Sequence, residues 1–390
     1  MAIDLERIRR DTPGTDHVLH FNNAGAALMP TAVIEAQTGH LALEAREGGY
    51  EAANLMSEKI DAVYDSIAAL INAGRDEIAV VENATVAWDM AFYALAFRPG
   101  DRILTAEVEY AANYIAYLQV AKRTGAVVET IPSEPAGEVS VEALERMVDD
   151  RVRLISMTHV PTNGGLVNPA AEIGAVAKRH GITFLLDACQ SVGQMPVDVQ
   201  AIGCDILSAT ARKYLRGPRG AGFLYIRKGL VEKLEPPMID MFAAEWVEPG
   251  RYELRKDARR FENWENNYAA KIGLGAAVDY ARAVGLETSW SRLRVLADAL
   301  RAGLSDIPGV SVKDIGSVKG GIVTFVKDGL SSDDIKTRLR AERVNVSVSP
   351  PSSTLLDTLA RDLPPLVRAS VHYYNSEDEV DRFLAAVRAL

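Results

Sequence analysis

Short apolar runs that alternate with helical patterns dominate the chain between residues 101 and 226. The runs are DRILTAE, AVVETIPS, VRLISMTHV, ITFLLDACQ, CDILSAT and GAGFLYI. Because each run is continuously apolar, we expect strands that are buried on both faces of a sheet. Helical patterns cover 113–124, 140–149 and 168–180, and Asn168 is expected to cap the last one. This alternation predicts an α/β fold in which a mostly parallel sheet lies between helices.

The pattern changes near residue 269. A long helical segment with a break at Gly285 comes first, and the strand-like runs GVSVKDI and GGIVTFV follow it. The chain ends in a helix that opens with SEDE at 376–379, a capping-box pattern. With few parallel crossovers, this part predicts a smaller α+β domain. We therefore expect three parts: residues 1–20, which pack with the small domain, a large domain over 21–268, and the small domain over 269–390.

The composition argues against several classes of function. A formal net charge of −10 argues against a nucleic-acid partner. No apolar run reaches the length of about 18 residues that a membrane span needs, and the charged start MAIDLERIRRD does not have the apolar centre of a signal peptide. Two cysteines, Cys189 and Cys204, are too few for a disulfide framework. We expect a cytoplasmic protein with reduced thiols, no membrane contact and no metal site.

Two charged side chains follow buried strands in the middle of the chain. Asp187 closes the run ITFLLD, and Lys213 follows the run CDILSAT after two residues, Ala211 and Arg212. A carboxylate in such a place is costly unless it is paired. Ligands of α/β sheets collect at the carboxyl ends of the strands, so both side chains can face one pocket. The spacing alone leaves two possibilities open: a structural ion pair, or a ligand with a cationic nitrogen and an aldehyde, such as pyridoxal phosphate (PLP).

The residues around Lys213 resemble the attachment site of the class V aminotransferase family. The matching pieces are CDIL at 204–207, TARK at 210–213 and GAG at 220–222, and the resemblance extends from FNNAGAALMP to VRASVHYYNSEDEVDRFL. This family includes cysteine desulfurases, isopenicillin N epimerase-like proteins and hercynylcysteine sulfoxide lyase-like enzymes. The resemblance implies PLP as the cofactor and the PLP fold of type I, with a seven-stranded type of sheet. It also implies a homodimer whose small-molecule substrate is an amino acid.

The same resemblance assigns cofactor-binding roles. Lys213 would form the Schiff base and move protons at the substrate Cα, Asp187 would keep the pyridine nitrogen protonated, and Gln190 would bind the ring hydroxyl. Tyr110 stands where relatives usually have a histidine that stacks on the ring, and it is the second candidate catalytic residue; it also fits a plain core or surface aromatic. The phosphate would lie against a helix N-terminus and nearby side chains, at Ala84, Thr85, Thr210 and Arg212.

Further residues are assigned to the substrate and to the neighbouring subunit. Arg368 would grip the α-carboxylate, although a structural ion pair remains the alternative. The other candidate substrate-binding residues are Ala24, Gly25, Tyr50, Thr162 and Asn163. In the segment RFENWE, Trp264 and Glu265 replace the Gly-Thr of relatives and are expected near the neighbouring active site. His159 more simply fits a hydrogen-bonded core residue.

The resemblance identifies the cofactor but leaves several reactions open. The region VNVSVSPPSSTLLDTL has no cysteine where desulfurases carry a mobile thiol, so we expect no persulfide-relay desulfurase. β-Elimination, transamination and epimerisation remain. EGGY at 47–50 resembles a stretch of hercynylcysteine sulfoxide lyase-like enzymes, and this resemblance favours β-elimination of a C–S bond in a cysteine-derived substrate. An inactive PLP-fold binding module is the alternative outside enzymes. The sequence GPRGAG precedes a strand, so it is not a dinucleotide-binding fingerprint.

Overall fold

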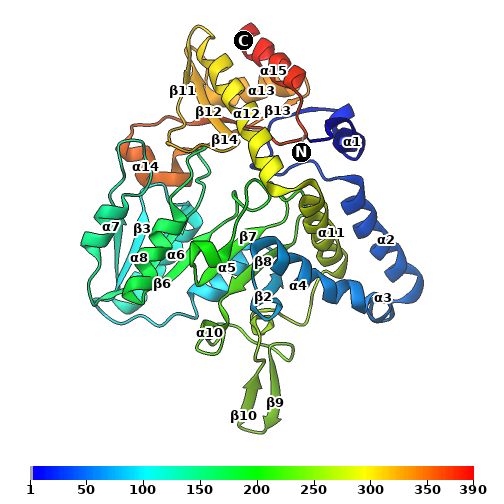
Figure 1. Cartoon of the computed structure of the whole chain (residues 1–390), viewed down its shortest axis with the longest axis vertical. Helices are drawn as coiled ribbons and strands as arrows, with labels where there is room; N and C mark the ends of the chain where they lie inside the picture. The colour runs from blue at the N-terminus through cyan, green and yellow to red at the C-terminus, as the bar shows by residue number, and fades with distance from the viewer. Residues whose placement is uncertain (1–2) are drawn as a thin grey trace.

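The structure is a computed structural model that describes residues 3–390. Its centre is a seven-stranded sheet with helices on both faces (Figure 1). The strands lie in the order β2-β8-β7-β6-β5-β3-β4, and only β8 is antiparallel to its neighbours. This arrangement confirms the predicted α/β fold with a mostly parallel sheet. The strands are β2 Ile78–Val81, β3 Arg102–Ala106, β4 Val127–Ile131, β5 Val152–Thr158, β6 Thr183–Asp187, β7 Ile206–Thr210 and β8 Gly222–Ile226.

Both faces of this sheet are buried, as the continuous apolar runs predict. Leu104 and Leu186 belong to one core cluster, whereas their strand neighbours Ile103 and Leu185 belong to another on the opposite face. The first face is covered by α4 Ser57–Ile71, α7 Val141–Met147, α8 Ala170–His180, α9 Val199–Ile202 and α11 Tyr268–Val284. The second face is covered by α5 Ala84–Phe92 and α6 Ala111–Thr124.

The C-terminal part builds a smaller α+β unit with its own core. Its antiparallel sheet has the order β11-β12-β15-β14, with strands β11 Val310–Val312, β12 Ile322–Lys327, β14 Ser347–Ser349 and β15 Leu366–Ser370. Its helices are α12 Leu286–Ser305, α13 Ser332–Ala341, α14 Leu355–Ala360 and α15 Glu377–Ala389, with η4 Pro351–Thr354 before α14. The predicted capping box is present, because Ser376 Oγ accepts from the Glu379 N–H and the Glu379 carboxylate accepts from the Ser376 N–H.

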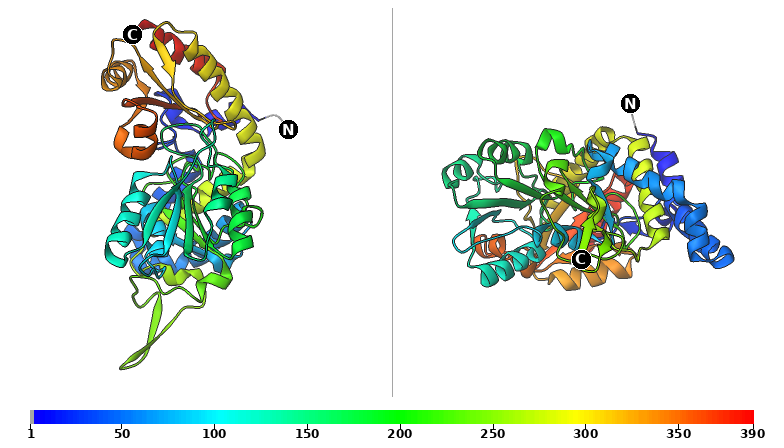
Figure 2. Two further views of the ribbon diagram at one scale, coloured as in Figure 1. Left: turned by 90° about the vertical axis from the view of Figure 1, so that its left-hand side faces the viewer. Right: turned by 90° about the horizontal axis from the view of Figure 1, so that it is seen from below.

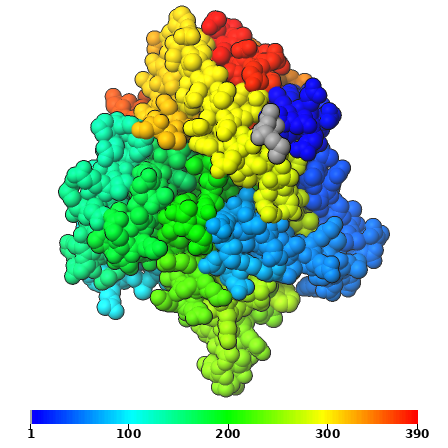
Figure 3. Space-filling view, viewed as in Figure 1, coloured from blue at the N-terminus to red at the C-terminus, as the bar shows by residue number. Residues whose placement is uncertain are grey.

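The N-terminal segment lies against this smaller unit. It consists of α1 Leu5–Arg10, η1 Pro13–Asp16 and β1 Leu19–His20. β1 pairs in parallel with β13 Val344–Asn345, and Ile8 packs with Tyr373 and Tyr374. Figure 3 shows this blue segment in contact with the yellow and red C-terminal part.

The helix α11 belongs by packing to the large domain. It lies on α4 and on α2 Thr31–Glu47, which is followed by α3 Gly49–Leu55. Leu274 and Val278 join the core on the first face of the large sheet, whereas the small-domain core begins with Leu293 in α12. A boundary at residue 269 would separate α11 from the helices on which it packs. We therefore propose the boundary at Gly285, the break between α11 and α12.

Two details differ from the sequence-based expectations. Asn168 does not cap α8, since its side-chain Nδ2 donates to the Thr158 carbonyl at 2.8 Å and its Oδ1 accepts from the Val139 N–H. A hairpin of β9 Ala244–Glu248 and β10 Arg251–Leu254 was not foreseen, and it projects from the end of the large domain opposite the small domain (Figure 2). The remaining short elements are η2 Arg75–Glu77, α10 Lys228–Val231 and η3 Ala258–Phe261.

Two kinds of feature are absent from residues 3–390. None of their helices is both long and apolar enough to cross a membrane. No group of three or more His, Cys, Asp or Glu side chains in this range is arranged to hold a metal ion.

Candidate active site

Lys213 and Asp187 lie near one another at the carboxyl edge of the large sheet. Asp187 is the last residue of β6, and its strand neighbours in register are Thr158 at the end of β5 and Ser208 in β7. Lys213 follows the end of β7 after two residues. Burial lowers the pKa of Lys213, while the nearby Cys189 and Asp187 act in the opposite direction. A half-buried lysine with a lowered pKa is a suitable nucleophile for an aldehyde.

The turn that follows Lys213 is tight, as its glycines predict. Gly217 N–H donates to the Ala211 carbonyl at 2.7 Å, and a Cβ on Gly217 would lie only 2.8 Å from the Ala211 Cβ. Gly220 has a φ of 76°, in the left-handed region that favours glycine. Arg216 has a φ of 61° although it is not a glycine. The turn therefore fixes where the chain leaves Lys213 and enters β8.

Asp187 is held by donors on two sides. Its Oδ1 accepts from the Cys189 N–H at 2.9 Å, and its Oδ2 accepts from Asn113 Nδ2 at 3.0 Å. The same Asn113 nitrogen donates to Glu109, a buried carboxylate in the loop between β3 and α6. The sequence analysis did not identify Glu109 or Asn113. The available signal was a spacing in the sequence: an acidic residue stands directly before Tyr110, and an asparagine follows that acidic residue after four positions.

Several buried polar atoms near this edge have no protein partner. They are Gln190 Oε1, His159 Nδ1 and Arg368 Nε. Burying polar atoms without partners is costly, so such atoms indicate a ligand that the site is built to hold. Gln190 Nε2 donates to the Ala24 carbonyl at 3.2 Å. Burial lowers the pKa of His159 to about 4, so its ring is neutral at pH 7, as expected for a core histidine. The donors and acceptors present fit PLP.

The phosphate side of the predicted site is formed by α5 and the end of β7. Asn83 caps α5 through a bond from the Val86 N–H, so Ala84 and Thr85 lie in the first turn of the helix. Gly222 at the start of β8 comes so close to Asn83 and Ala84 that a Cβ there would lie 3.1 Å from the Ala84 nitrogen. Thr85 is exposed and its helix N-terminus is directed at the strand ends, an arrangement suited to an anion.

Two further residues of the predicted cofactor site lie beside this helix end. Thr210 is the buried last residue of β7. Arg212 is half-buried, donates to the Gly25 carbonyl, and has its pKa lowered by burial and by Arg219. Tyr110 precedes α6 and is 38% exposed. It is also close enough to Arg212 to oppose the lowering of that pKa.

Arg368 is buried in β15 without a carboxylate partner. One of its terminal nitrogens donates to the Thr162 carbonyl at 3.2 Å and to Thr162 Oγ1 at 2.5 Å. No ion pair between Arg368 and a carboxylate is found among residues 3–390. Burial lowers its pKa, and Tyr214 and Tyr110 oppose that effect. Arg368 therefore does not form the structural ion pair that was the alternative. Its buried guanidinium suits an incoming carboxylate.

Some of the predicted substrate-binding residues are engaged elsewhere. Asn163 Nδ2 donates to Asp357 Oδ2 in α14 at 2.6 Å, so its side chain binds the small domain. The Ala24 N–H donates to Ser370 Oγ at 2.9 Å, and the Gly25 N–H donates to the Asn22 carbonyl at 3.0 Å. A substrate carboxylate would have to compete with both of these partners.

Tyr50 does not join the Lys213 cluster. It lies in α3, at the margin of the molecule in Figure 1, and is 71% exposed. Together with Trp264 and Glu265 it lines a surface cavity of about 320 Å³. Trp264 is itself 50% exposed. The sequence-based placement of Tyr50 beside the substrate therefore does not hold within one chain, because α3 extends away from the sheet.

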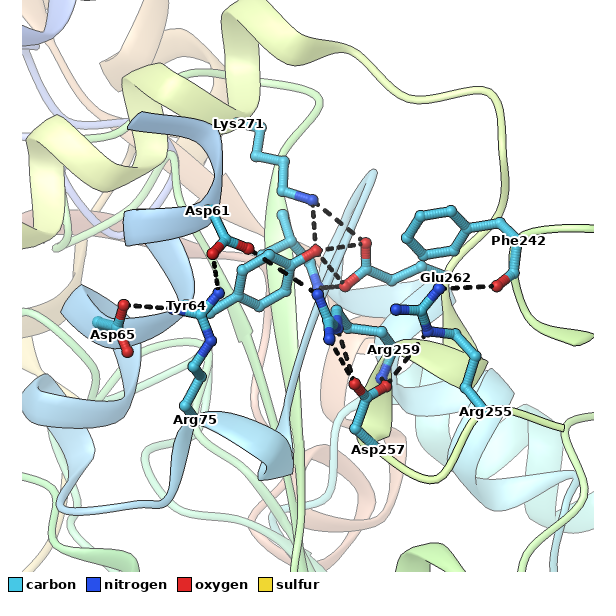
Figure 4. A network of polar contacts seen from close by, with 11 residues as sticks. Asp61, Tyr64, Asp65, Arg75, Phe242, Arg255, Asp257, Arg259, Glu262 and Lys271 are labelled. Carbon is cyan, nitrogen blue, oxygen red and sulfur yellow. Dashed lines mark hydrogen bonds and ion pairs between the residues drawn. The ribbon is translucent and has the colours of Figure 1, made fainter. Parts of the chain in front are cut away.

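The segment that carries Trp264 is anchored by a buried polar network (Figure 4). Glu262 accepts hydrogen bonds from the Val80 N–H at 2.9 Å and from the Tyr64 hydroxyl at 2.8 Å. Lys271 in α11 lies 3.2 Å from the Glu262 carboxylate and donates to the Tyr64 hydroxyl at 2.5 Å. This network joins β2, α4 and α11, so the loop after Glu262 leaves the core at a fixed point.

The fold and site define a PLP enzyme of fold type I, and comparison with known proteins identifies the family. Residues 19–383 match the family model Aminotransferase class-V, and the chain belongs to this family. PLP is therefore its cofactor.

Similar proteins cover the whole chain. A protein of Pyrococcus abyssi named "Probable cysteine desulfurase" is 30% identical over 99% of this chain and 97% of its own. The apo structure of a cysteine desulfurase from Thermococcus onnurineus NA1 has a TM-score of 0.92 and 28% identity, and covers 100% of this chain and 98% of that one. The complex of "the cystine C-S lyase C-DES" with "its reaction product cysteine persulfide" has a TM-score of 0.87 and 25% identity, with coverage of 97% and 99%.

These relatives correct one prediction. The absence of a cysteine from the C-terminal region was taken to exclude a desulfurase, and relatives that carry the name cysteine desulfurase contradict that exclusion. The physical reason is that a thiol in that loop bears only on where sulfur goes after a C–S bond is broken, so its absence does not exclude the cleavage itself. The composition of one loop therefore does not decide the reaction.

Proposed function

We propose that this enzyme cleaves the Cβ–S bond of a cysteine-type amino acid. The observation that carries the proposal is the buried guanidinium of Arg368, which has no carboxylate partner among the described residues and faces the same pocket region as Lys213. Such a pair suits a substrate with an α-carboxylate and an α-amino group. The relatives named cysteine desulfurase and cystine C-S lyase support sulfur at Cβ.

Each residue has a role that follows from its position. PLP, when bound, supplies an electron-withdrawing ring that stabilises negative charge at the substrate Cα. Asp187 is placed to hold a proton on the ring nitrogen, and Arg368 orients the substrate through its carboxylate. Lys213, whose pKa is lowered by burial, takes and returns the proton at Cα. Asp187 and Arg368 are buried, which limits the access of water to the groups that they contact.

Product analysis with cysteine, cystine and S-substituted cysteines tests the proposal. β-Elimination, the course predicted from the sequence, gives pyruvate and ammonia, and desulfuration gives alanine; both break the same Cβ–S bond. A 2-oxo acid that retains its sulfur would indicate transamination, and the opposite enantiomer would indicate epimerisation. Either of these as the main product overturns the proposal. So does a protein that takes up added PLP, shown by its visible absorbance, but turns over none of these substrates.

The Lys213→Ala variant tests the role of the lysine. We expect it to bind PLP through the phosphate side of the site while losing at least about a thousandfold in turnover, since proton transfer and the covalent link are both removed. The matched control is Lys228→Ala. Lys228 is exposed and follows the end of β8, which lies beside the start of β7 and so at the opposite edge of the sheet from Lys213. Unchanged turnover in Lys213→Ala would contradict the mechanism.

We also propose that the chain acts as a homodimer in which Tyr50, Trp264 and Glu265 lie near the neighbouring active site. Two large exposed aromatic side chains around one cavity support this assignment. Trp264→Ala should shift the equilibrium towards monomer in analytical ultracentrifugation, whereas Trp246→Ala on the projecting hairpin, 77% exposed, should not. A wild-type chain that sediments as a monomer would refute the dimer.

A further inference from the structure

Glu109 is a buried carboxylate surrounded by donors. It is 3% exposed and lies in the loop that leads from β3 to α6. Its Oε1 accepts from the Tyr110 N–H at 2.8 Å and from Asn113 Nδ2 at 2.9 Å. Its Oε2 accepts from Thr105 Oγ1 at 3.0 Å and from the Thr158 N–H at 3.1 Å, and the Thr158 hydroxyl donates to Oε1 at 2.5 Å. No part of the proposed reaction uses this group directly.

Asn113 connects Glu109 to Asp187. Its single Nδ2 lies 2.9 Å from Glu109 and 3.0 Å from Asp187. A side-chain amide nitrogen has two hydrogens, so one points to each carboxylate. If the amide turned over, its oxygen would face two acceptors and both bonds would be lost. Glu109 therefore removes the freedom of the Asn113 amide to turn, and it does so from the side away from Asp187.

We propose that Glu109 is a positioning residue for the cofactor: it orients the Asn113 amide towards Asp187 and thereby sets how strongly Asp187 holds the ring nitrogen. The same carboxylate fixes the backbone of Tyr110, the predicted stacking residue, and the end of β5 at Thr158. Three sides of the predicted ring site thus depend on one buried group. The proposal rests on PLP binding and not on which bond of the substrate is broken.

The charge of Glu109 agrees with this geometry. Burial raises its pKa to about 7, the hydrogen bonds from Thr158 and Asn113 lower it, and the nearby Asp187 raises it. The two carboxylates are therefore close enough for the charge of Asp187 to act on Glu109 across the amide.

Glu109→Gln in the PLP-loaded protein tests the proposal. All of the partners of Glu109 are donors, so a glutamine NH2 group must face one side of this cluster, and the bond from Asn113 is either lost or made to a neutral oxygen, which holds the amide less firmly than a carboxylate. We expect about tenfold weaker PLP binding. The visible absorbance band of bound PLP should also move, and so should the midpoint of the pH titration of that band. The control is Glu107→Gln, in the same loop, whose carboxylate accepts from Ser133 Oγ at 3.0 Å. A Glu109→Gln protein with wild-type affinity and spectrum overturns the proposal.

A second variant tests whether the effect passes through Asn113. Asn113→Ala keeps Glu109 but removes the bridge, so it should displace the absorbance band in the same direction. Because Glu109 acts in part through Asn113, the double variant should displace the band by clearly less than the sum of the two single displacements; fully additive displacements overturn the proposal. Asn113→Ala keeps the test open if Glu109→Gln does not fold, and a wild-type spectrum in Asn113→Ala also overturns it. All readouts report on the cofactor, so they stand whatever products the enzyme makes.

Discussion

Replacing Lys271 by methionine should strongly destabilise the large domain. Lys271 and Glu262 form a buried ion pair, with side chains 4% and 0% exposed. Methionine preserves much of the volume and removes the charge, so Glu262 keeps its bonds from Val80 and Tyr64 but loses the buried cation that contacts its carboxylate. Breaking a buried pair from one side costs about 3–5 kcal/mol, because the remaining charge is left without compensation.

Chemical unfolding of PLP-free protein at pH 7 measures this cost. The control is Lys228→Met, since Lys228 pairs with Asp76 at 3.7 Å on the surface, with side chains 72% and 58% exposed. An exposed pair contributes about 0–1 kcal/mol, so the control should move the unfolding midpoint little. Comparing the two variants separates the buried charge from the general effect of removing a lysine.

The double variant Lys271→Met with Glu262→Gln tests the cause. Neutralising Glu262 removes the uncompensated charge, so the double variant should lose less stability than the two single variants together, by more than about 1 kcal/mol. Additive losses, or a cost below about 1 kcal/mol for Lys271→Met alone, would refute the argument that the network in Figure 4 is held by this charge pair.

Two further predictions concern buried ionisable groups. The folded pKa of Glu109, about 7, lies above its usual value of 4.5, so its contribution to stability is present below pH 4.5 and is lost as the pH rises through 7; Glu109→Gln should remove a fall of about 3 kcal/mol over this range in pH-dependent unfolding of PLP-free protein. Arg216→Gly relieves a left-handed backbone but removes a buried guanidinium that bonds Thr12, Leu28 and Tyr373 and lies 4.6 Å from the Tyr374 ring centroid. We expect a net loss of about 2 kcal/mol or more in the same unfolding assay, and a gain in stability would contradict this balance.

The positions of Lys213 and Asp187 could be predicted because simple physical rules fix them. Continuous apolar runs identify β6 and β7 as buried strands, and parallel strands bring their carboxyl ends to one edge. The glycines after Lys213 likewise predict a turn at Gly217 and Gly220. Each of these inferences depends on a few consecutive residues, so no knowledge of tertiary packing is needed.

Contacts between distant segments could not be predicted in this way. The Glu109–Asn113–Asp187 bridge joins residues 74 positions apart, and Arg216 meets Thr12 across 204 positions. Asn168 illustrates the same limit: its position before Pro169 suits a cap, but the nearby Thr158 carbonyl and Val139 N–H bind it instead. At that position the tertiary hydrogen bonds of the side chain outweigh its local propensity to cap a helix.

The reaction depends on features that lie furthest from the Lys213 motif. In the proposed mechanism Lys213, Asp187 and Arg368 serve any α-amino acid, so they do not separate elimination, desulfuration, transamination and epimerisation. What separates these outcomes is the group that meets the substrate beyond Cα. In this chain, Tyr50 and Trp264 are exposed around a cavity outside the Lys213 cluster. If a second chain brings that cavity to its neighbour's pocket, then the choice of substrate is made by residues that the sequence places far from the lysine, and the dimer is the unit in which specificity must be measured.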